Sequence, residues 1–426
     1  MSNAYGSVNY FEKYAPGKND LVCEYRVEPK GITLERAAQH IAAESSIGTW
    51  TGLATLTQGI IRRLKPKIFF IDKRSGLVRI AYPADLFEKG NMPQVLSSIA
   101  GNIFGMDVLK KLRLEDITFP KSIMGSFSGP EFGIGGIRKM TGVKKRPLVG
   151  TIVKPKLGLG SREHAKAAYN AWVGGCDIVK DDENLTSQSF NRFDERLKET
   201  LKMRDRAESE TGEKKMYMIN ITAETGEMMK RAKKAKKAGN EYAMIDMLTS
   251  GFSALQTLRA SELGLVIHAH RAGHAAFTRG KHGISMLTIA KIARLIGVDQ
   301  LHIGTARLGK MEGSPEEVVG IEQEIESGMI KGKGHVLEQD WFGIKPVFAV
   351  ASGGLYAGAV PKLIRIMGSN IIIQAGGGVH GHKGGSVSGA MSMRQAIDAA
   401  MNKIPLKEYA EKHRELRQAI EQWGMV

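Results

Sequence analysis

Residues 149–154, Val-Gly-Thr-Ile-Val-Lys, form an apolar, β-branched stretch that ends in a lysine, and residues 162–173 follow with the spacing of an amphipathic helix. A second apolar stretch ending in lysine comes next, at 177–180. This alternation recurs with a period of roughly thirty residues, as successive βα units do. The candidate strands lie at 149–154, 177–180, 216–222, 242–247, 265–270, 300–305, 347–352 and 371–375. Eight strands with intervening helices predict a closed (β/α)8 TIM barrel, and a doubly wound open sheet, which usually has fewer strands, is the alternative.

The residues before this repeat show a different order of elements. The order βαβββαβ predicts a ferredoxin-like α+β domain with one added strand. Its strand patterns lie at 21–27, 49–55, 67–71, 77–82 and 112–119, and its helical patterns lie at 33–45 and 93–104. A further amphipathic helix is expected at 408–423. The predicted domains are an N-terminal domain at 1–121, a connector at 122–147, the α/β barrel at 148–403 and a C-terminal helical extension at 404–426.

The composition is that of a globular enzyme except for its charge. Lys and Arg number 61 against 44 Asp and Glu, which gives a formal charge of +17. Such an excess can serve a nucleic-acid partner, a basic surface without a partner, or the attraction of a polyanionic small molecule. The densest lysine cluster, 233–237, has no interleaved aromatic residues for base stacking. We therefore rank nucleic acid last and expect none as a partner.

Cysteine content and hydropathy indicate the compartment. Cys23 and Cys176 both lie in apolar segments, which favours two buried thiols and a reducing environment over a disulfide. No run of eighteen apolar residues occurs, and the first residues are polar. We expect a cytoplasmic protein without a membrane partner.

Charged residues follow the first two barrel strands, at the barrel end where active sites of this fold lie. Lys154 and Lys156 are two apart, so both can point over the barrel end, although such lysines are often merely solvated. Residues 180–184, Lys-Asp-Asp-Glu-Asn, place carboxylates at the end of an apolar strand. Carboxylates without Cys or His suit a hard cation such as Mg²⁺, although a surface salt-bridge cluster is the alternative.

Histidines, glycines and further cations follow the later strands. The segment 268–274, His-Ala-His-Arg-Ala-Gly-His, favours acid–base work and phosphate pairing by Arg271 over a zinc site, because no further ligands have suitable spacing. His302 precedes a glycine-flanked loop, 304–310, which is either a mobile lid carrying Lys310 or a simple turn. Glycines at 353–354 and 376–378 follow the last two strands, where barrels commonly bind phosphate. With the lysines near the first strand, they indicate a substrate with phosphate at two ends.

These motifs resemble those of a known family. Residues 150–159, Gly-Thr-Ile-Val-Lys-Pro-Lys-Leu-Gly-Leu, and residues 174–184, Gly-Gly-Cys-Asp-Ile-Val-Lys-Asp-Asp-Glu-Asn, closely resemble signatures of the large subunit of ribulose-bisphosphate carboxylase/oxygenase (Rubisco). The later motifs resemble that family in the same order, at 268–274, 302–310, 350–354 and 374–378, as do 44–51 and 101–105 near the N-terminus. The resemblance spans nearly the whole chain, and the Lys-Asp-Asp-Glu strand end is its most specific part.

The resemblance implies a reaction and a cofactor. The lysine of the Lys-Asp-Asp-Glu motif in this family forms a carbamate with activating CO₂, which would make Lys180, Asp182 and Glu183 the Mg²⁺ ligands here. The carbamate would be the base that enolises ribulose 1,5-bisphosphate, to which CO₂ or O₂ adds, giving 3-phosphoglycerate from CO₂. Lys154 would protonate the final carbanion, and Lys310 would stabilise the carboxylate of added CO₂. His270 would contact substrate oxygens as a further catalytic group.

The remaining matched positions would bind the substrate. From the barrel these are Lys156, Arg271, His302, Ser352, Gly354, Gln374, Gly376 and Gly377. From a neighbouring subunit, Glu44, Thr49, Trp50 and Asn102 would reach the barrel end, so the smallest active unit would be a homodimer.

The alternative within the family is an enolase or isomerase that acts on a phosphorylated sugar without fixing CO₂. Those members replace several of the positions above, whereas Lys310 and Asn102 are intact here. The chain departs from the usual pattern at Arg307, a bulky cation in the lid, and at Ile152, where plant-type enzymes have threonine. Its details look most like archaeal form III enzymes, which implies a role in nucleoside or ribose-phosphate metabolism. We then expect dimers or assemblies of dimers and no small subunit.

Overall fold

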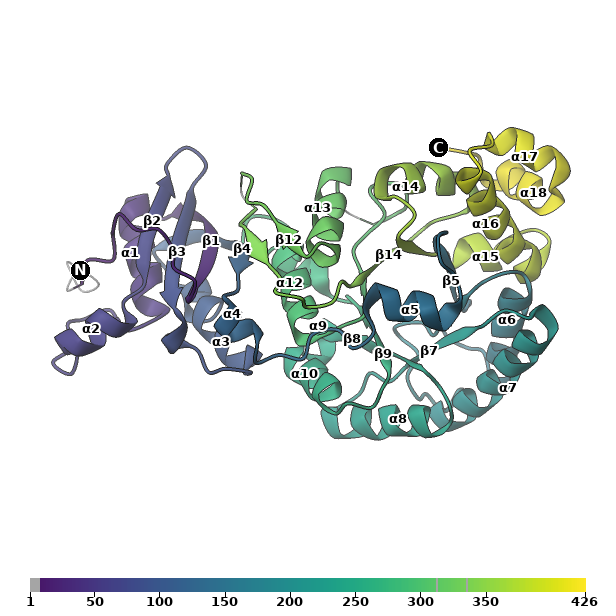
Figure 1. Ribbon diagram of the computed structural model, residues 1–426, viewed down its shortest axis with the longest axis horizontal. Helices are drawn as coiled ribbons and strands as arrows, with labels where there is room; N and C mark the ends of the chain where they lie inside the picture. The colour runs from purple at the N-terminus through teal and green to yellow at the C-terminus, as the bar shows by residue number, and fades with distance from the viewer. Residues whose placement is uncertain (1–7, 312, 335) are drawn as a thin grey trace. The chain divides into compact units, whose positions relative to one another are not determined.

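The computed structural model describes residues 8–311, 313–334 and 336–426, and its chain forms two compact units (Figure 1). The first unit contains Met1–Ser128, Gly273–Ile296 and Ser327–Ile344, and the second contains Gly129–Ala272, Gly297–Glu326 and Lys345–Val426. Two segments inside the predicted barrel range, 273–296 and 327–344, thus belong to the first unit. The domain bounds given above stay predictions.

The second unit contains a closed barrel of eight parallel strands, which confirms the predicted TIM barrel. Buried parallel strands need apolar side chains on both faces, and most residues of these strands are buried. The strands are β5 (Leu148–Ile152), β6 (Ile178–Lys180), β7 (Met216–Asn220), β8 (Tyr242–Asp246), β9 (Val266–His270), β11 (Gln300–His302), β14 (Phe348–Ser352) and β15 (Ile371–Gln374). The helices of this unit that follow them include α6 (Ser161–Val173), α7 (Phe193–Thr211), α8 (Thr225–Lys237), α10 (Phe252–Ala260), α13 (Pro315–Glu326), α14 (Val360–Met367) and α16 (Gly385–Met401).

The two ends of the barrel differ, and we call the end with the last residues of the strands the mouth and the other end the base. Helix α5 (Gly133–Thr141) fills the centre of the base, and Figure 1 shows it in front of the strands. Its Ile134 and Ile137 are buried in one cluster with the first residues of strands, among them Leu148, Ile178 and Met216. Burying each such side chain contributes about 1.5–3 kcal/mol. The polar strand ends therefore gather at the mouth.

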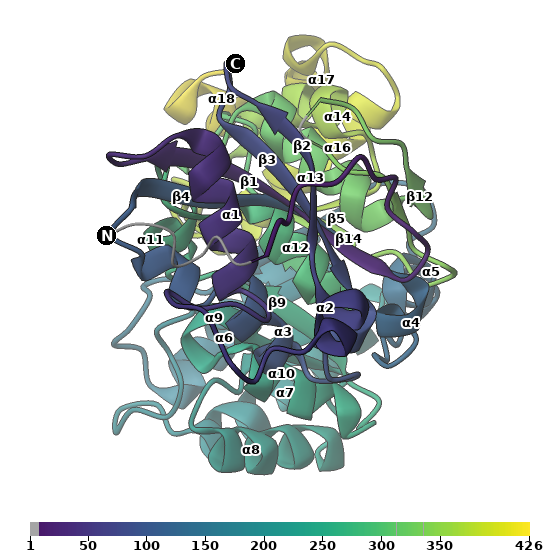
Figure 2. The same cartoon turned by 90° about the vertical axis from the view of Figure 1, so that its left-hand side faces the viewer.

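The first unit contains a five-stranded sheet in the order β10-β4-β1-β3-β2. Strand β1 (Asp20–Pro29) pairs antiparallel with β3 (Leu77–Pro83) and β4 (Leu109–Thr118), and β2 (Lys67–Asp72) pairs with β3. Helix α1 (Leu34–Glu44) lies against this sheet (Figure 2), and α2 (Gln58–Leu64) and α3 (Met92–Ile99) belong to the same unit. The edge strand β10 (Gly283–Ile284) comes from much later in the chain.

Three predictions about helices and strands were wrong. Residues 49–55 form bends and turns instead of a strand, because β-prone residues without a partner strand gain no ladder hydrogen bonds. Trp50 in this loop is 68% exposed. The helix expected at 93–104 ends at Ile99, and Asn102–Gly105 forms a separate 3₁₀ turn. The C-terminal helix is two helices, α17 (Leu406–Lys412) and α18 (Arg414–Trp423), separated at His413, whose backbone is extended. The N-terminal order is therefore βααββαβ, with Thr49–Thr55 as a loop. No helix of the described residues is long and apolar enough to cross a membrane.

Candidate active site

The two lysines after β5 point at the carboxylates after β6. Lys154 Nζ lies 2.6 Å from Asp182 Oδ2, and Lys156 Nζ lies 3.3 Å from Glu183 Oε1. The stem of Lys154 passes over Gly376, where an added Cβ would lie 2.9 Å from Lys154 Cε. Glycine at 376 therefore makes room for the lysine, in addition to any role in binding a ligand.

Lys180 ends β6 and is completely buried. Its Nζ donates to the carbonyl oxygen of Asp181 at 2.7 Å and lies 3.6 Å from Glu183 Oε2. Burial lowers the pKa of this amine, and the neighbouring carboxylates, Glu183 first, only partly oppose the shift. A lowered pKa makes the neutral, nucleophilic form of a lysine more accessible near neutral pH.

The three carboxylates after Lys180 divide into two groups. Asp182 and Glu183 face the lysines, and although burial raises the pKa of Glu183, Lys180 and His270 outweigh it and lower the value to about 2. Asp181 instead is held by fully buried partners from other elements. It accepts hydrogen bonds from Arg196 Nε at 3.0 Å, Tyr217 Oη at 2.7 Å and the Asn220 backbone at 3.0 Å. Asp181 therefore fixes the loop, and two carboxylates are left to face a ligand.

A carboxylate that the sequence reasoning missed, Asp246, orients His270. Asp246 and His270 end the neighbouring strands β8 and β9 in register, and Asp246 Oδ1 lies 2.6 Å from His270 Nδ1. A hydrogen bond to this carboxylate requires a proton on Nδ1 and fixes the orientation of the ring. Nε2 lies 3.8 Å from Glu183 Oε2. The available signal was an acidic residue at the end of a predicted strand.

Two further histidines form a buried chain. His268 Nδ1 lies 2.9 Å from Gln300 Oε1, and His268 Nε2 lies 2.8 Å from His302 Nε2. With the amide oxygen of Gln300 as an acceptor, His268 is protonated on Nδ1, so the shared bond requires His302 to donate from Nε2. Burial lowers the pKa of both rings well below the usual value, so both are neutral. Nδ1 of neutral His302 is then an acceptor, and its ring lies 4.7 Å from that of His270.

Arg271 follows β9 as an almost completely buried cation. Burial lowers its pKa to about 10, with Glu317 opposing the shift, so it stays charged at neutral pH. The described part of the chain gives it no hydrogen bond and no ion pair within 4 Å. A buried cation in this state is suited to an anionic ligand.

The loops after β11 and β14 are packed against each other. Lys310 donates its backbone N–H to Gly353 O at 2.9 Å, and an added Cβ on Gly309 would lie 2.0 Å from that oxygen. Gly354 is constrained too, though less severely, because its Cβ would lie 2.9 Å from Lys310 N. Arg307 in the same loop has a positive φ of 63°, which is unusual for a residue with a side chain. Lys310 is thereby held beside the glycines that follow Ser352.

The other barrel positions expected to bind substrate lie at the end of β15 and in the residues after it. Gln374 lies within the barrel wall, with its Cγ against Gly150, and its buried Oε1 has no hydrogen bond among the described residues. Gly377 begins a short helix, α15 (Gly377–His380). The remaining expected residues, Glu44, Thr49, Trp50 and Asn102, belong to the first unit, at the end of α1, in the loop after it and at the start of the 3₁₀ turn.

The mouth is suited to an anionic ligand, with lysines facing carboxylates in the loops after neighbouring strands and a buried arginine after β9 that has no ion pair among the described residues. Comparison with known proteins then gives the family. Residues 9–123 match the family model for the N-terminal domain of the ribulose bisphosphate carboxylase large chain, and residues 133–423 match the model for its catalytic domain. The chain belongs to the ribulose bisphosphate carboxylase large-chain family.

Archaeal relatives cover nearly the whole chain. A ribulose bisphosphate carboxylase of Methanosarcina acetivorans is 53% identical over 417 residues, which cover 96% of this chain and 97% of the relative. That of Methanocaldococcus jannaschii is 52% identical over 420 residues, covering 96% and 98%. Among solved structures, the dimeric archaeal Rubisco of Hyperthermus butylicus matches with a TM-score of 0.92 and 48% identity, covering 98% of this chain and 99% of that one. The octameric Rubisco of Pyrococcus horikoshii matches with a TM-score of 0.90 and 48% identity, covering 97% and 96%.

Proposed function

We propose that the barrel mouth carboxylates ribulose 1,5-bisphosphate, which makes the chain a carbon–carbon lyase, and that it uses Mg²⁺ and a carbamate on Lys180. The observation that carries the proposal is the buried Lys180 amine beside Asp182 and Glu183. Relatives of about 50% identity are named ribulose bisphosphate carboxylase, which supports carboxylation rather than the enolase or isomerase alternative.

The donor set fits Mg²⁺ once Lys180 has reacted. Within the described ranges, no group of three or more His, Cys, Asp and Glu side chains is arranged to hold a metal ion. Attack of the neutral Lys180 amine on CO₂ forms an N–C bond and releases a proton. The resulting carbamate adds an anionic oxygen ligand to those of Asp182 and Glu183. Three anionic oxygens suit Mg²⁺, which polarises a substrate carbonyl when it is bound. Lys154, now paired with Asp182, is then released to face the substrate.

The other residues at the mouth each act in a different step of the proposed reaction. The Lys180 carbamate removes the C3 proton of the substrate, and the resulting enediolate attacks CO₂. His270, oriented by Asp246, and His302 contact the substrate oxygens. Lys310 stabilises the new carboxylate. Water then adds to the C3 ketone, the C2–C3 bond breaks with its electron pair left on C2, and Lys154 protonates this carbanion.

The bisphosphate is held at its two ends. Arg271, buried and unpaired among the described residues, would hold one phosphate. The glycine loops after β14 and β15, with Lys156, would bind a hydroxyl and the other phosphate. In this assignment Ser352, Gly354, Gln374, Gly376 and Gly377 position the substrate rather than take part in proton transfer.

The site is completed by a second copy of the chain. Glu44, Thr49, Trp50 and Asn102 carry catalytic residue types but belong to the first unit, so we assign them to the mouth of a partner subunit. The related structures are titled dimeric and octameric, which supports a homodimer or a higher assembly of dimers. An archaeal form III enzyme of this kind needs no small subunit, also reacts with O₂, and serves nucleoside or ribose-phosphate metabolism in the cytoplasm.

The test is incorporation of labelled CO₂ from ribulose 1,5-bisphosphate into 3-phosphoglycerate after preincubation with CO₂ and Mg²⁺. We expect labelled product from the wild type and none from Lys180→Ala. Hybrid dimers of Asn102→Ala and Lys154→Ala chains should recover part of the activity, since one mouth then has both residues. Consumption of the bisphosphate to an unlabelled isomer would instead establish the enolase or isomerase alternative.

A further inference from the structure

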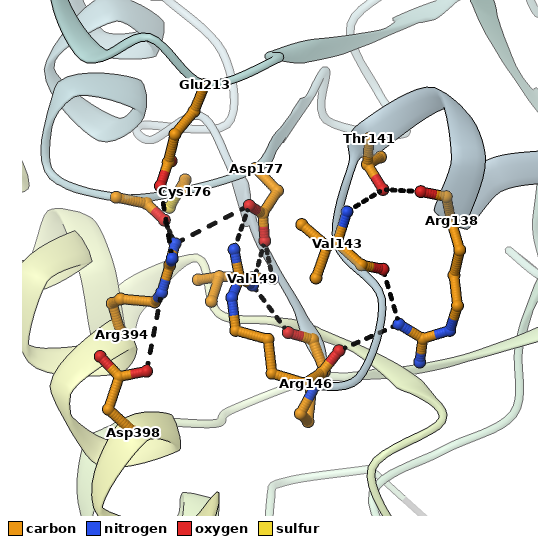
Figure 3. Close-up of polar contacts among 12 residues, drawn as sticks. Arg138, Thr141, Val143, Arg146, Val149, Cys176, Asp177, Glu213, Arg394 and Asp398 are labelled. Atoms are coloured by element: carbon orange, nitrogen blue, oxygen red, sulfur yellow. Dashed lines mark hydrogen bonds and ion pairs between the residues drawn. The ribbon is translucent and has the colours of Figure 1, made fainter.

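A cavity of about 710 Å³ lies at the base of the barrel, away from the residues assigned to catalysis. Its walls come from the segment after α5, the residues before β6 and β7, and the last turns of α16. Figure 3 shows Arg146 and Arg394 pointing toward Asp177 from two sides. Small-molecule sites typically have volumes of about 300–1,000 Å³, and this open cavity falls within that range.

The inner wall of this cavity is a balanced ion network. Arg146 binds Asp177 with two contacts of 2.7 Å, and Asp177 also accepts the Val149 N–H at 2.8 Å. Arg394 lies 3.3 Å from Glu213 and 3.8 Å from both Asp177 and Asp398. The buried Lys215 also binds Glu213, at 2.8 Å. Three carboxylates thus meet two arginines in the inner wall and the buried Lys215 behind it.

The rim adds cations that no carboxylate balances. Lys144 and Lys145 line the cavity, are exposed, and have no hydrogen bond or ion pair in the described part of the chain. A third rim lysine, Lys214, is paired with Glu208 at 3.2 Å. The cavity therefore has an excess of at least two positive charges, both at its rim.

A structural explanation accounts for only some of these cations. Helices α5, α7 and α16 end at this cavity, and cations near the carboxyl ends of helices offset their partial negative charge. Arg138 lies in the last turn of α5 and also donates to the loop carbonyl oxygens of Val143 and Arg146, and Arg394 donates to the loop carbonyl oxygen of Gly175. Lys144 and Lys145 lie beyond the end of α5, and neither donates a hydrogen bond to a carbonyl oxygen of the described residues. They are left for an anion from solution.

We propose that the basal cavity is a second anion site, separate from the mouth, that binds a small phosphorylated molecule. Lys144 and Lys145 would meet the phosphate, while the inner network keeps Arg146 and Arg394 in place behind it. A compact polyanion suits two flexible lysines, which act as point charges without demanding one geometry. The site also gives a local role to part of the +17 charge of the chain.

The test is equilibrium dialysis of labelled pyrophosphate against the intact protein. Every protein carries Arg271→Ala, which removes the cation assigned to phosphate at the mouth. Lys144→Ala/Lys145→Ala is compared with Lys233→Ala/Lys237→Ala, which removes two exposed lysines of α8 and the same charge. We expect the first pair to weaken binding at least tenfold or to lose one bound pyrophosphate per chain, and the second pair to match the parent protein.

Two results would overturn the proposal. Unchanged binding in Lys144→Ala/Lys145→Ala would show that these lysines hold no anion, and an equal loss in both pairs would show only diffuse attraction to a basic surface. Competition by ribose 5-phosphate or by adenosine monophosphate then distinguishes a sugar phosphate from a nucleotide. Because dialysis requires no turnover, its outcome does not depend on the carboxylase assignment.

Discussion

The mouth and the base of the barrel both gather lysines, arginines and carboxylates, but they differ in how completely the charges of their buried groups are paired. At the base, Asp177 meets Arg146 through two contacts of 2.7 Å. At the mouth, Lys180 lies 3.6 Å from its nearest carboxylate, and Arg271 has no partner among the described residues. Paired ions fix the fold, whereas incompletely paired buried ions cost stability and are ready for a ligand.

Replacing Lys180 should have the largest effect on activity and should not lower stability. Lys180→Met keeps the volume of the side chain but cannot form a carbamate, so carboxylation should fall at least about a thousandfold, because several kcal/mol of charge stabilisation depend on the metal. Replacing a buried, poorly paired charge by an apolar group is often neutral or stabilising. Labelled-CO₂ incorporation and the apparent unfolding midpoint should be measured on one preparation.

A Lys180→Met variant that is inactive and also much less stable would contradict the difference between the mouth and the base. Lys180 would then be a structural residue whose loss removes activity indirectly. Wild-type activity that is indifferent to a chelator would contradict the metal assignment independently.

Replacing Asp177 should lower stability and leave turnover unchanged. Asp177→Ala leaves Arg146 without its partner, and removing one member of a buried pair typically costs about 3–5 kcal/mol. Asp398→Ala is the matched control, because that half-exposed carboxylate lies 3.8 Å from Arg394 and should cost less than about 1 kcal/mol. Denaturant unfolding gives the stabilities. Turnover per folded active site should be unchanged in both variants, and a large loss in Asp177→Ala would contradict the division between the two ends.

The sequence predicted the mouth better than the base for a physical reason. Parallel strands in a barrel are buried on both faces, so they are short apolar runs, and polar residues where they end, such as Lys180 and Arg271, stand out. Side-chain direction is not in the pattern. Three acids follow Lys180, and only the structure shows that Asp181 turns to Arg196 while Asp182 meets Lys154.

Contacts across the chain were also beyond sequence reasoning. The pair of Asp246 and His270 depends on the register of neighbouring strands, which periodicity does not give. Ile284 joins the sheet of the first unit from about 170 residues after its partner Leu114, and short apolar pieces of this kind have no pattern of their own. The strand predicted at 49–55 was wrong for the converse reason. Its residues have the pattern of a strand, but they have no partner strand and form a loop.

Replacing Lys310 should separate two steps of the reaction at the mouth. If this lysine meets the carboxylate only as CO₂ adds, it acts on the transition state of that step more than on substrate binding. Lys310→Ala should therefore still exchange the C3 proton of ribulose 1,5-bisphosphate but lose about 2–4 kcal/mol, roughly a hundredfold or more in rate, in carboxylation. Proton exchange and carboxylation are measured side by side. Equal losses would mean that the Lys310 side chain supports the site as a whole rather than the CO₂ step, because Lys310→Ala keeps the backbone N–H that donates to Gly353.

The smallest predicted effect concerns the pH dependence of stability near the mouth. His380 in α15 is partly buried, with Nδ1 2.9 Å from Ser386 Oγ and a buried Nε2 that has no hydrogen bond among the described residues. Burial, with smaller contributions from Lys154 and His164, lowers its pKa from 6.5 to about 4. A histidine with a lower pKa in the folded chain is protonated first in the unfolded chain, so acid favours unfolding. The penalty is absent above about pH 6.5, grows as the pH falls, and becomes constant below about pH 4.

His380→Gln removes this titration, so the comparison rests on how stability changes with pH rather than on its absolute value. Between pH 7.5 and 5, the wild type should lose on the order of 1–2 kcal/mol more stability than the variant. Apparent unfolding midpoints at several pH values measure the difference. Parallel curves would show that His380 is not a neutral buried ring in the folded chain. Curves that diverge above pH 6.5 would assign the effect to another group, and His380 would then not be one of the incompletely paired residues near the mouth.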